Sequence, residues 1–312
     1  MENLVLSFTV VFPLFVQLVL GYGLKRIKLL DDHTLGVCNK LVFRVFLPCL
    51  LFLNVYRADL AQVFNARLLA WAAAAILMSF CALMVLIPLF EKDPKKRGVL
   101  VQGIFRSNFA LFGVPVAVSL FGQENSGVAS ILTVVVIPMF NMLSVVALEV
   151  FRGGKPNAGR MLLGIAKNPL ILSTLTGLLL LLLDVSLPQV LVDALDDISQ
   201  VATPLSLVVL GGSFEFSKLR GSLREMAIGV LGRLVGVPAV FLPLFAVLGF
   251  RDAEMGAVLV MLASPTAVSS FPMAIEMDAD GTLAGQIVVG TTLFCIVTLF
   301  FWIFLLKELG WM

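Results

Sequence analysis

Charge is scarce in this 312-residue chain, because only 13% of its residues are Asp, Glu, Lys or Arg, against about 25% in soluble domains. Histidine is represented by His33 alone, and no CxxC spacing indicates a metal or redox site. The four cysteines, which we expect to pack as thiols, are Cys38, Cys49, Cys81 and Cys295. The formal net charge of +2 gives no reason to expect a nucleic-acid partner. The composition excludes an ordinary soluble domain and predicts an integral membrane protein without a metal cofactor.

Long apolar runs take the place of charge: 60% of the residues are hydrophobic and the mean hydropathy is +1.04. These runs lack the two-residue alternation of membrane β-strands, so we expect an all-α, multi-pass protein of the cell membrane. The first run follows Glu2 and no basic segment, which favours a membrane span over a cleaved signal. Charge-free windows and helix breakers predict ten transmembrane helices, at residues 5–24, 35–54, 68–90, 98–121, 127–148, 163–183, 198–212, 225–250, 255–275 and 283–306.

Loop charge predicts the orientation. Most of the 22 basic residues fall in the loops after spans one, three, five and seven, which should face the cytoplasm. The opposite loops and the C-terminal end hold only Arg57, Arg67, Arg251 and Lys307. We therefore expect both termini outside. Five spans per half is an odd number, so the predicted division is a first repeat at 1–151, a cytoplasmic link at 152–162 and an inverted second repeat at 163–312.

Two of the spans are interrupted by Gly, Ser and Pro, at SNFALFGVPVA (107–117) and SPTAVSSFPMA (264–274). At an offset of 157 residues Ser107 aligns with Ser264, and Pro115 with Pro272. Proline removes a helical hydrogen bond, and irregular backbone survives in a membrane only where protein or a water-filled cavity covers it. Paired interruptions of this kind are typical of secondary transporters. We therefore expect spans four and nine to cross at their breaks and to form the binding site.

Several motifs resemble a known family. They are GYGLKR (21–26), FLPCLLF (46–52), Asn108 with Gly113-Val114-Pro115, ATPLSLVVLGG (202–212), and ASPTAVSSF (263–271) followed by Asp280. With them, essentially the whole chain resembles the auxin efflux carrier family in its bacterial form, whose members include permeases for malate- and malonate-like acids. The resemblance implies two inverted five-helix repeats. Spans one, two, six and seven would form a scaffold that dimerises, while spans three to five and eight to ten would move as an elevator-like or rocking transport unit.

The residues around the breaks supply candidates for binding an anion. A half-helix that restarts after a break begins with unpaired N–H groups and a partial positive charge, which suits a carboxylate. Arg106 and Arg233 are the cationic candidates, with membrane snorkelling as the alternative for Arg233, and Gly and Ser could instead serve helix packing. Glu276 is the candidate for a coupling proton or cation. The expected substrate-binding set is Asn108, Gly113, Pro115, Ser264, Pro265, Thr266, Ser269, Arg106 and Arg233.

These features favour a secondary transporter of a small organic anion or weak acid, such as an auxin-, malate- or malonate-like acid, with H⁺ or Na⁺ as possible coupling ions. The direction of transport stays open. The main alternative is a Na⁺-coupled carrier of larger amphipathic acids that resembles bile-acid symporters. That carrier would need a Na⁺ site of carbonyl and Ser, Thr or Asn oxygens at the crossing. A channel is a further alternative, which we disfavour because the spans show no ring of charged residues. An intramembrane enzyme would need a positioned catalytic pair that the spans do not offer, so we expect no enzyme.

Overall fold

The computed structural model describes residues 2–57, 65–122, 127–152 and 158–312. Over these ranges the chain folds into helices, with one isolated β-bridge and no strand, which confirms the expected all-α fold class. Five helical passages are long and apolar enough to cross a membrane: Asp32–Tyr56, Ala66–Phe90, Gly127–Val150, Leu223–Val247 and Gly281–Glu308. The integral membrane assignment is thus supported, while the ten-span inverted repeat and the domain division stay predictions. Residues 153–157 of the expected link lie outside the described residues.

The first half contains helices close to each of its five expected spans. They are α1 (Glu2–Arg26), α2 (Asp32–Leu41), a π-helical turn (Val42–Phe46), α3 (Leu47–Tyr56), α4 (Ala66–Phe90), α5 (Pro94–Phe105), α6 (Phe109–Phe121) and α7 (Gly127–Val150). The π-helical turn was not foreseen and joins α2 to α3 within one passage. Asp31, Asn65 and Asp93 cap the starts of α2, α4 and α5 by accepting a bond from a main-chain N–H.

The second half repeats this pattern with more interruptions. It contains α8 (Ala158–Ala166), α9 (Pro169–Leu182), α10 (Gln189–Gln200), α11 (Ala202–Ser213), a 3₁₀ turn (Phe216–Gly221), α12 (Leu223–Leu231), a second π-helical turn (Gly232–Gly236), α13 (Val237–Val247), α14 (Asp252–Ala263), α15 (Ser270–Glu276) and α16 (Gly281–Glu308). The expected span at 198–212 is therefore preceded by a full amphipathic helix, α10, that carries three aspartates.

Two glycines allow α1 and α11 to pack with their backbones almost touching. A Cβ added to Gly21 would lie 2.0 Å from the carbonyl oxygen of Val208, and one added to Gly211 would lie 2.0 Å from that of Leu18. Small residues at membrane helix interfaces permit this close approach. Gly21 and Gly211 belong to the GYGLKR and ATPLSLVVLGG motifs, so two of the motifs meet in space.

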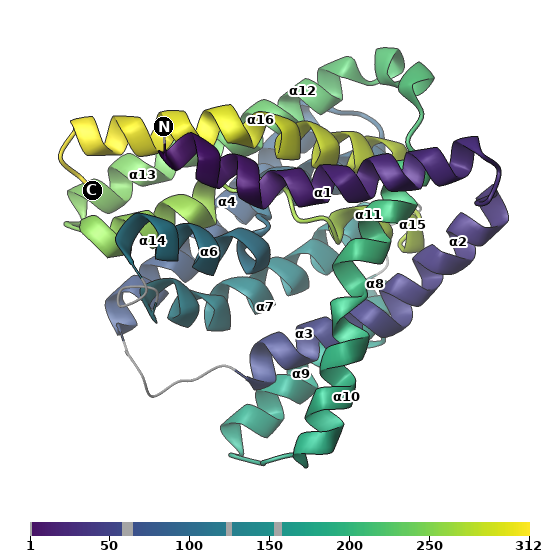
Figure 1. Ribbon diagram of the computed structural model, residues 1–312, viewed down its shortest axis with the longest axis horizontal. Helices are drawn as coiled ribbons and strands as arrows, with labels where there is room; N and C mark the ends of the chain where they lie inside the picture. Colours follow the sequence, from purple (N-terminus) through teal and green to yellow (C-terminus); the bar gives the residue numbers. More distant parts are fainter. Residues whose placement is uncertain (1, 58–64, 123–126, 153–157) are drawn as a thin grey trace.

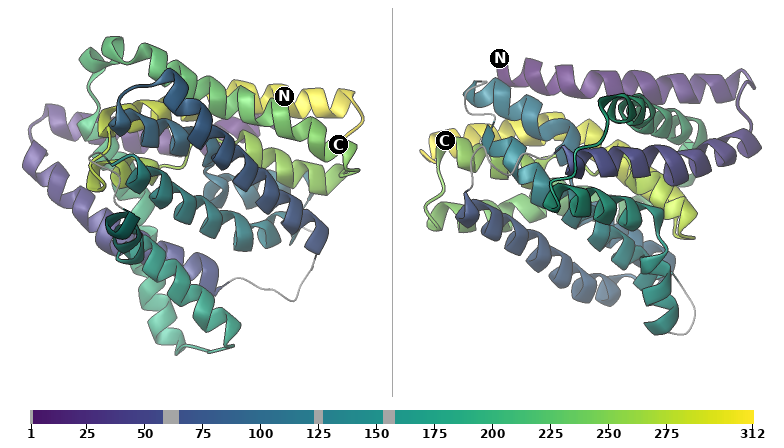
Figure 2. Two further views of the ribbon diagram at one scale, coloured as in Figure 1. Left: turned by 180° about the vertical axis from the view of Figure 1, so that it is seen from behind. Right: turned by 90° about the horizontal axis from the view of Figure 1, so that it is seen from below.

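The helices pack closely on one another (Figures 1 and 2), and we name two sets of them for description, leaving aside α8, which contacts α7 and α9. We call α1, α2, α3, α9, α10 and α11 the scaffold group, because α1 packs on α11 while α3 packs on α9 and α10. The crossing group comprises α4 to α7 and α12 to α16, with α5 packed on α4 and α7, and α14 on α6 and α13. In Figure 1, α3, α9 and α10 form the lower corner of the molecule, and α1 and α16 run alongside each other near the top.

Candidate functional site

Both expected interruptions exist, and each is shorter than the motif that revealed it. Between α5 and α6 only Arg106, Ser107 and Asn108 leave the helical conformation, and between α14 and α15 the interruption covers residues 264–269. Pro115 lies within α6, seven residues beyond Asn108, so the expectation that it marks the break is wrong. The interruption instead coincides with the polar residues that precede the proline.

The two interruptions lie against each other as a short antiparallel pair. Ser107 and Thr266 form a β-bridge, and the Asn108 N–H donates to the Pro265 carbonyl at 2.7 Å. The Thr266 hydroxyl donates to the Gly103 carbonyl at 2.6 Å, while its N–H donates to the Thr291 hydroxyl at 3.1 Å. Main-chain groups released by the breaks thus pair with one another across the crossing, which is how irregular backbone can persist away from water.

Arg233 lies beneath this crossing and is completely buried. Its guanidinium donates to main-chain carbonyls at the ends of the two helices that stop there, α5 and α14. The acceptors are Ile104 (3.1 Å), Phe105 (2.9 Å), Met261 (2.9 Å), Leu262 and Ser264 (2.8 Å). A guanidinium has five N–H donors, so none is left for a ligand. Contrary to expectation, Arg233 is directed at the protein's own backbone and does not line the cavity described below.

Arg106 is the second buried cation and has different surroundings. It is 3% exposed and donates to the Asn141 amide oxygen, to the Ser269 hydroxyl at 2.6 Å and to the Met273 sulfur at 2.7 Å. No carboxylate in the described part of the chain forms an ion pair with it. These three bonds leave two of its five N–H groups without a described partner.

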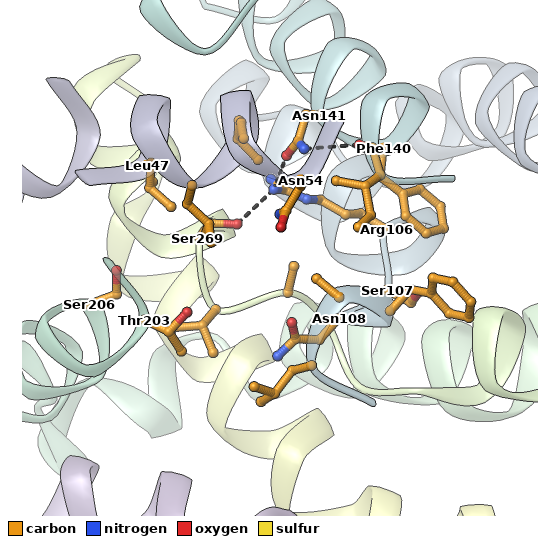
Figure 3. A pocket seen from close by; sticks show the side chains of 18 residues that line it. Leu47, Asn54, Arg106, Ser107, Asn108, Phe140, Asn141, Thr203, Ser206 and Ser269 are labelled. Atoms are coloured by element: carbon orange, nitrogen blue, oxygen red, sulfur yellow. Dashed lines mark hydrogen bonds between the residues drawn. The ribbon is translucent and has the colours of Figure 1, made fainter. Parts of the chain in front are cut away.

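A cavity of about 160 Å³ lies beside Arg106, between the crossing and helices α3, α7 and α11 (Figure 3). Its polar lining consists of one cation and a set of neutral groups. These are Arg106, Asn54, Ser107, Asn108, Asn141, Thr203, Ser206 and Ser269. Ser107 has a buried hydroxyl with no described partner, and none of the described residues that line the cavity is an acid. The start of α6 lies at its wall, and the first turn of a helix carries a partial positive charge. Such an environment suits an anion.

The structure brings only part of the expected set to the cavity. Arg106, Asn108 and Ser269 line it. Ser264 and Pro265 instead hold the crossing together through their main-chain carbonyls, and Thr266 does so through its N–H and its hydroxyl. Gly113 lies against the Phe109 ring, where an added Cβ would approach to 3.1 Å, and Pro115 is exposed. Gly113 and Pro115 therefore shape α6 and do not contact the cavity.

Glu276 lies at the other end of α15, away from the cavity. It accepts a hydrogen bond of 3.1 Å from the Asn39 amide of α2. Asn39 is 2% exposed, and its own amide oxygen has no described partner. This contact joins the scaffold group to the crossing group, so a role in coupling stays a prediction that the geometry allows.

Sequence reasoning missed several cavity residues that come from helices outside the breaks. Asn141 was detectable as an amide inside the apolar run 127–148, because buried polar groups in spans are costly and usually functional. Thr203 and Ser206 lie in the ATPLSLVVLGG motif, and Asn54 closes the expected second span. Their convergence on Arg106 depends on tertiary packing, which one sequence does not show.

Comparisons with known proteins agree with a transport role. The family model described as "Membrane transport protein" matches residues 6–303. An uncharacterized transporter of Methanocaldococcus jannaschii is 22% identical over 94% of this chain and 96% of its own length. An uncharacterized transporter of Methanothermobacter thermautotrophicus is 25% identical over 94% of this chain and 96% of its own. A candidate malonate transporter of Rhizobium meliloti is 23% identical over 96% of this chain and 95% of its own.

Proposed function

This chain belongs to the membrane transport protein family, the family of the auxin efflux carriers, and we propose that it carries a small organic acid anion across the cell membrane at the cavity beside Arg106. Residues from several of the motifs that predicted the family line this cavity. Asn108 and Ser269 come from the two breaks, and Thr203 and Ser206 from the ATPLSLVVLGG motif.

The observation that carries the proposal is the unpaired charge of Arg106. Removing an ion from water costs several kcal/mol unless an opposite charge and hydrogen bonds compensate it. The neutral Asn141 and Ser269 supply hydrogen bonds, and no described carboxylate supplies the charge. An arginine fork is well suited to a carboxylate, and the amide and hydroxyl groups around the cavity can bind the remaining oxygens of such a ligand.

Cavity size supports a small acid over an amphipathic one. Pockets for drug-sized ligands measure about 300–1,000 Å³, whereas this cavity measures about 160 Å³. A three- or four-carbon dicarboxylic acid is the class that we favour, in keeping with the name of the Rhizobium relative. The larger acids of the bile-acid type would need an expanded cavity.

The proposed mechanism is alternating access, in which the crossing group shifts against the scaffold group and exposes the cavity to each side in turn. The cavity lies at the boundary, since Asn54, Thr203 and Ser206 come from the scaffold group and the remaining polar residues from the crossing group. Two inverted five-helix repeats, outside termini and a homodimer formed through the scaffold group belong to the same proposal. For malonate-like acids, the coupling ion that we propose is H⁺.

A ligand-binding screen tests the proposal. Purified protein is titrated with malonate, malate, an indole acid and a bile acid, in Na⁺ and in K⁺, by thermal shift and scintillation proximity. We expect a dicarboxylate to bind, and Arg106→Gln to weaken it by about thirtyfold or more, because removing one member of a buried charged pair costs about 2 kcal/mol or more.

Two further variants locate the site. Asn108→Ala should weaken binding less than Arg106→Gln, since it removes a neutral group. Arg251→Gln is the control, because it also removes a hydrogen-bonded guanidinium, one that donates to the main-chain carbonyls of Ala246 and Phe250 and does not line the cavity. Binding that survives Arg106→Gln and Asn108→Ala would place the ligand elsewhere and overturn the proposed site.

A further inference from the structure

The environment of Arg233 is that of a cation site built from backbone. Five carbonyl oxygens, two from α5 and three from the end of α14, surround one buried guanidinium at 3.1 Å or less. The last carbonyls of a helix have no partner within the helix and carry its partial negative charge. Two helix ends therefore direct their negative poles at the same point.

In transporters with interrupted helices, such carbonyl-rich ends coordinate the coupling Na⁺, while the opposite half-helix starts bind the anionic substrate. Carbonyl oxygens are also the donors that hard cations prefer. Here the start of α6 lies at the cavity, as expected for an anion, but the ends of α5 and α14 are occupied by a side chain of the protein itself. Five carbonyls that the Na⁺-coupled alternative could use are therefore already hydrogen-bonded.

We propose that Arg233 is a tethered replacement for a coupling cation, and that transport at the crossing therefore requires no Na⁺. The inference builds on the proposed carrier function and specifies its energetics. A diffusible ion would bind and leave in each cycle, whereas Arg233 holds α5 and α14 together in every state. The crossing then keeps one shape with or without ligand, and Arg106 and the start of α6 stay available to the anion.

The local sequence GRLVG explains how a charged side chain reaches this position. Gly232 brings the passage close to α5, since a Cβ added there would meet the Ile104 side chain at 3.0 Å. The π-helical turn 232–236 sets Arg233 beneath the crossing. The other π-helical turn, 42–46, also contains an arginine, Arg44, but that side chain is exposed and has no hydrogen bond to another described residue. Arg44 is therefore a matched control.

Ion replacement on the unmodified protein is the first test. Uptake of the bound acid into proteoliposomes, and the Tm of purified protein, are measured in Na⁺, K⁺ and N-methylglucamine chloride at equal ionic strength. We expect both to be the same in all three salts. Uptake that stops without Na⁺ would overturn the inference while leaving the carrier function intact. If no acid is taken up in any salt, the proposed function fails, and the Tm series and the rescue below still test Arg233.

Chemical rescue tests the replacement directly. Arg233→Ala removes the cation and leaves five carbonyls facing a space, so we expect the Tm to fall by about 5–10 °C. Millimolar guanidinium should raise the Tm again, Na⁺ should raise it more than N-methylglucamine, and Arg44→Ala should show neither effect. If Arg233→Ala does not fold, Arg233→Lys keeps the charge with three donors and should retain Na⁺-independent uptake at a lower Tm. A neutral Arg233→Met variant with unchanged Tm and uptake would contradict the proposal.

Discussion

At the scale of single residues, the two buried arginines have opposite relations to their surroundings. Arg233 has every donor paired with main-chain carbonyls, whereas Arg106 has neutral side-chain partners and a cavity beside it. Both were visible in the sequence as charges within or beside apolar runs. Their different roles were not visible in the sequence, because these roles depend on which helix ends each side chain can reach.

Asn141 offers a test of the charge in the cavity. Asn141→Asp places a carboxylate of nearly the same shape against Arg106, which neutralises it and opposes a bound anion. We expect anion affinity to fall by about a hundredfold or more, because like charges brought together in a buried site cost several kcal/mol. Isothermal titration with the acid identified in the screen measures the change.

The control for this change is Asn168→Asp. Asn168 is also buried, at 6% exposure, and caps the start of α9, where a carboxylate is as good a cap as an amide. It does not line the cavity. Equal losses for Asn141→Asp and Asn168→Asp would show a general effect on folding and count against a charge-selective site.

At the scale of helices, the sequence predicted the interruptions well and their causes less well. Both breaks lie within the expected segments, since a mid-span cluster of Ser, Asn and Pro disfavours a continuous helix. Pro115 nevertheless lies inside α6, where the lost N–H leaves only the Leu111 carbonyl without its helical partner. The π-helical turns at 42–46 and 232–236 have no composition that sets them apart, so they appear only in the structure.

The contact of α1 with α11 makes a sharp prediction for Gly211. Gly211→Ala places a methyl group 2.0 Å from the Leu18 carbonyl, so the helices must separate. We expect a loss of about 1–3 kcal/mol in unfolding free energy, the usual cost of overpacking. Thermal unfolding in detergent measures it.

Gly23→Ala, on α1, the helix that Gly211 of α11 contacts, is the matched control. Gly23 has nothing within 4 Å of an added Cβ, so the change should be neutral or stabilise by about 0.5–1 kcal/mol through the better helix propensity of alanine. Equal effects at Gly23 and Gly211 would mean that helix propensity, and not the contact of α1 with α11, decides the stability.

At the scale of the whole molecule, composition was enough to identify a helical membrane protein, and the paired breaks were enough to locate a crossing. The division into two packed groups follows from contacts between segments far apart in the chain, such as α1 with α11 and α3 with α9. The family resemblance implied a scaffold and a moving transport unit, and that functional division stays a prediction. The proposed alternating access requires the two groups to move against each other.

Cross-linking between the groups tests that motion. The hydrogen bond from Asn39 to Glu276 joins α2 of the scaffold group to α15 of the crossing group, whereas the ion pair of Arg57 with Asp196 joins α3 to α10 within the scaffold group. In a protein whose native cysteines are replaced, the pairs Asn39→Cys with Glu276→Cys and Arg57→Cys with Asp196→Cys are joined by a short bis-maleimide. Alternating access requires the first pair to separate, so its cross-link should arrest uptake while the second leaves uptake unchanged. Full uptake with the Asn39–Glu276 positions joined would mean that the two groups move together, and the moving part would then have to be sought within the crossing group.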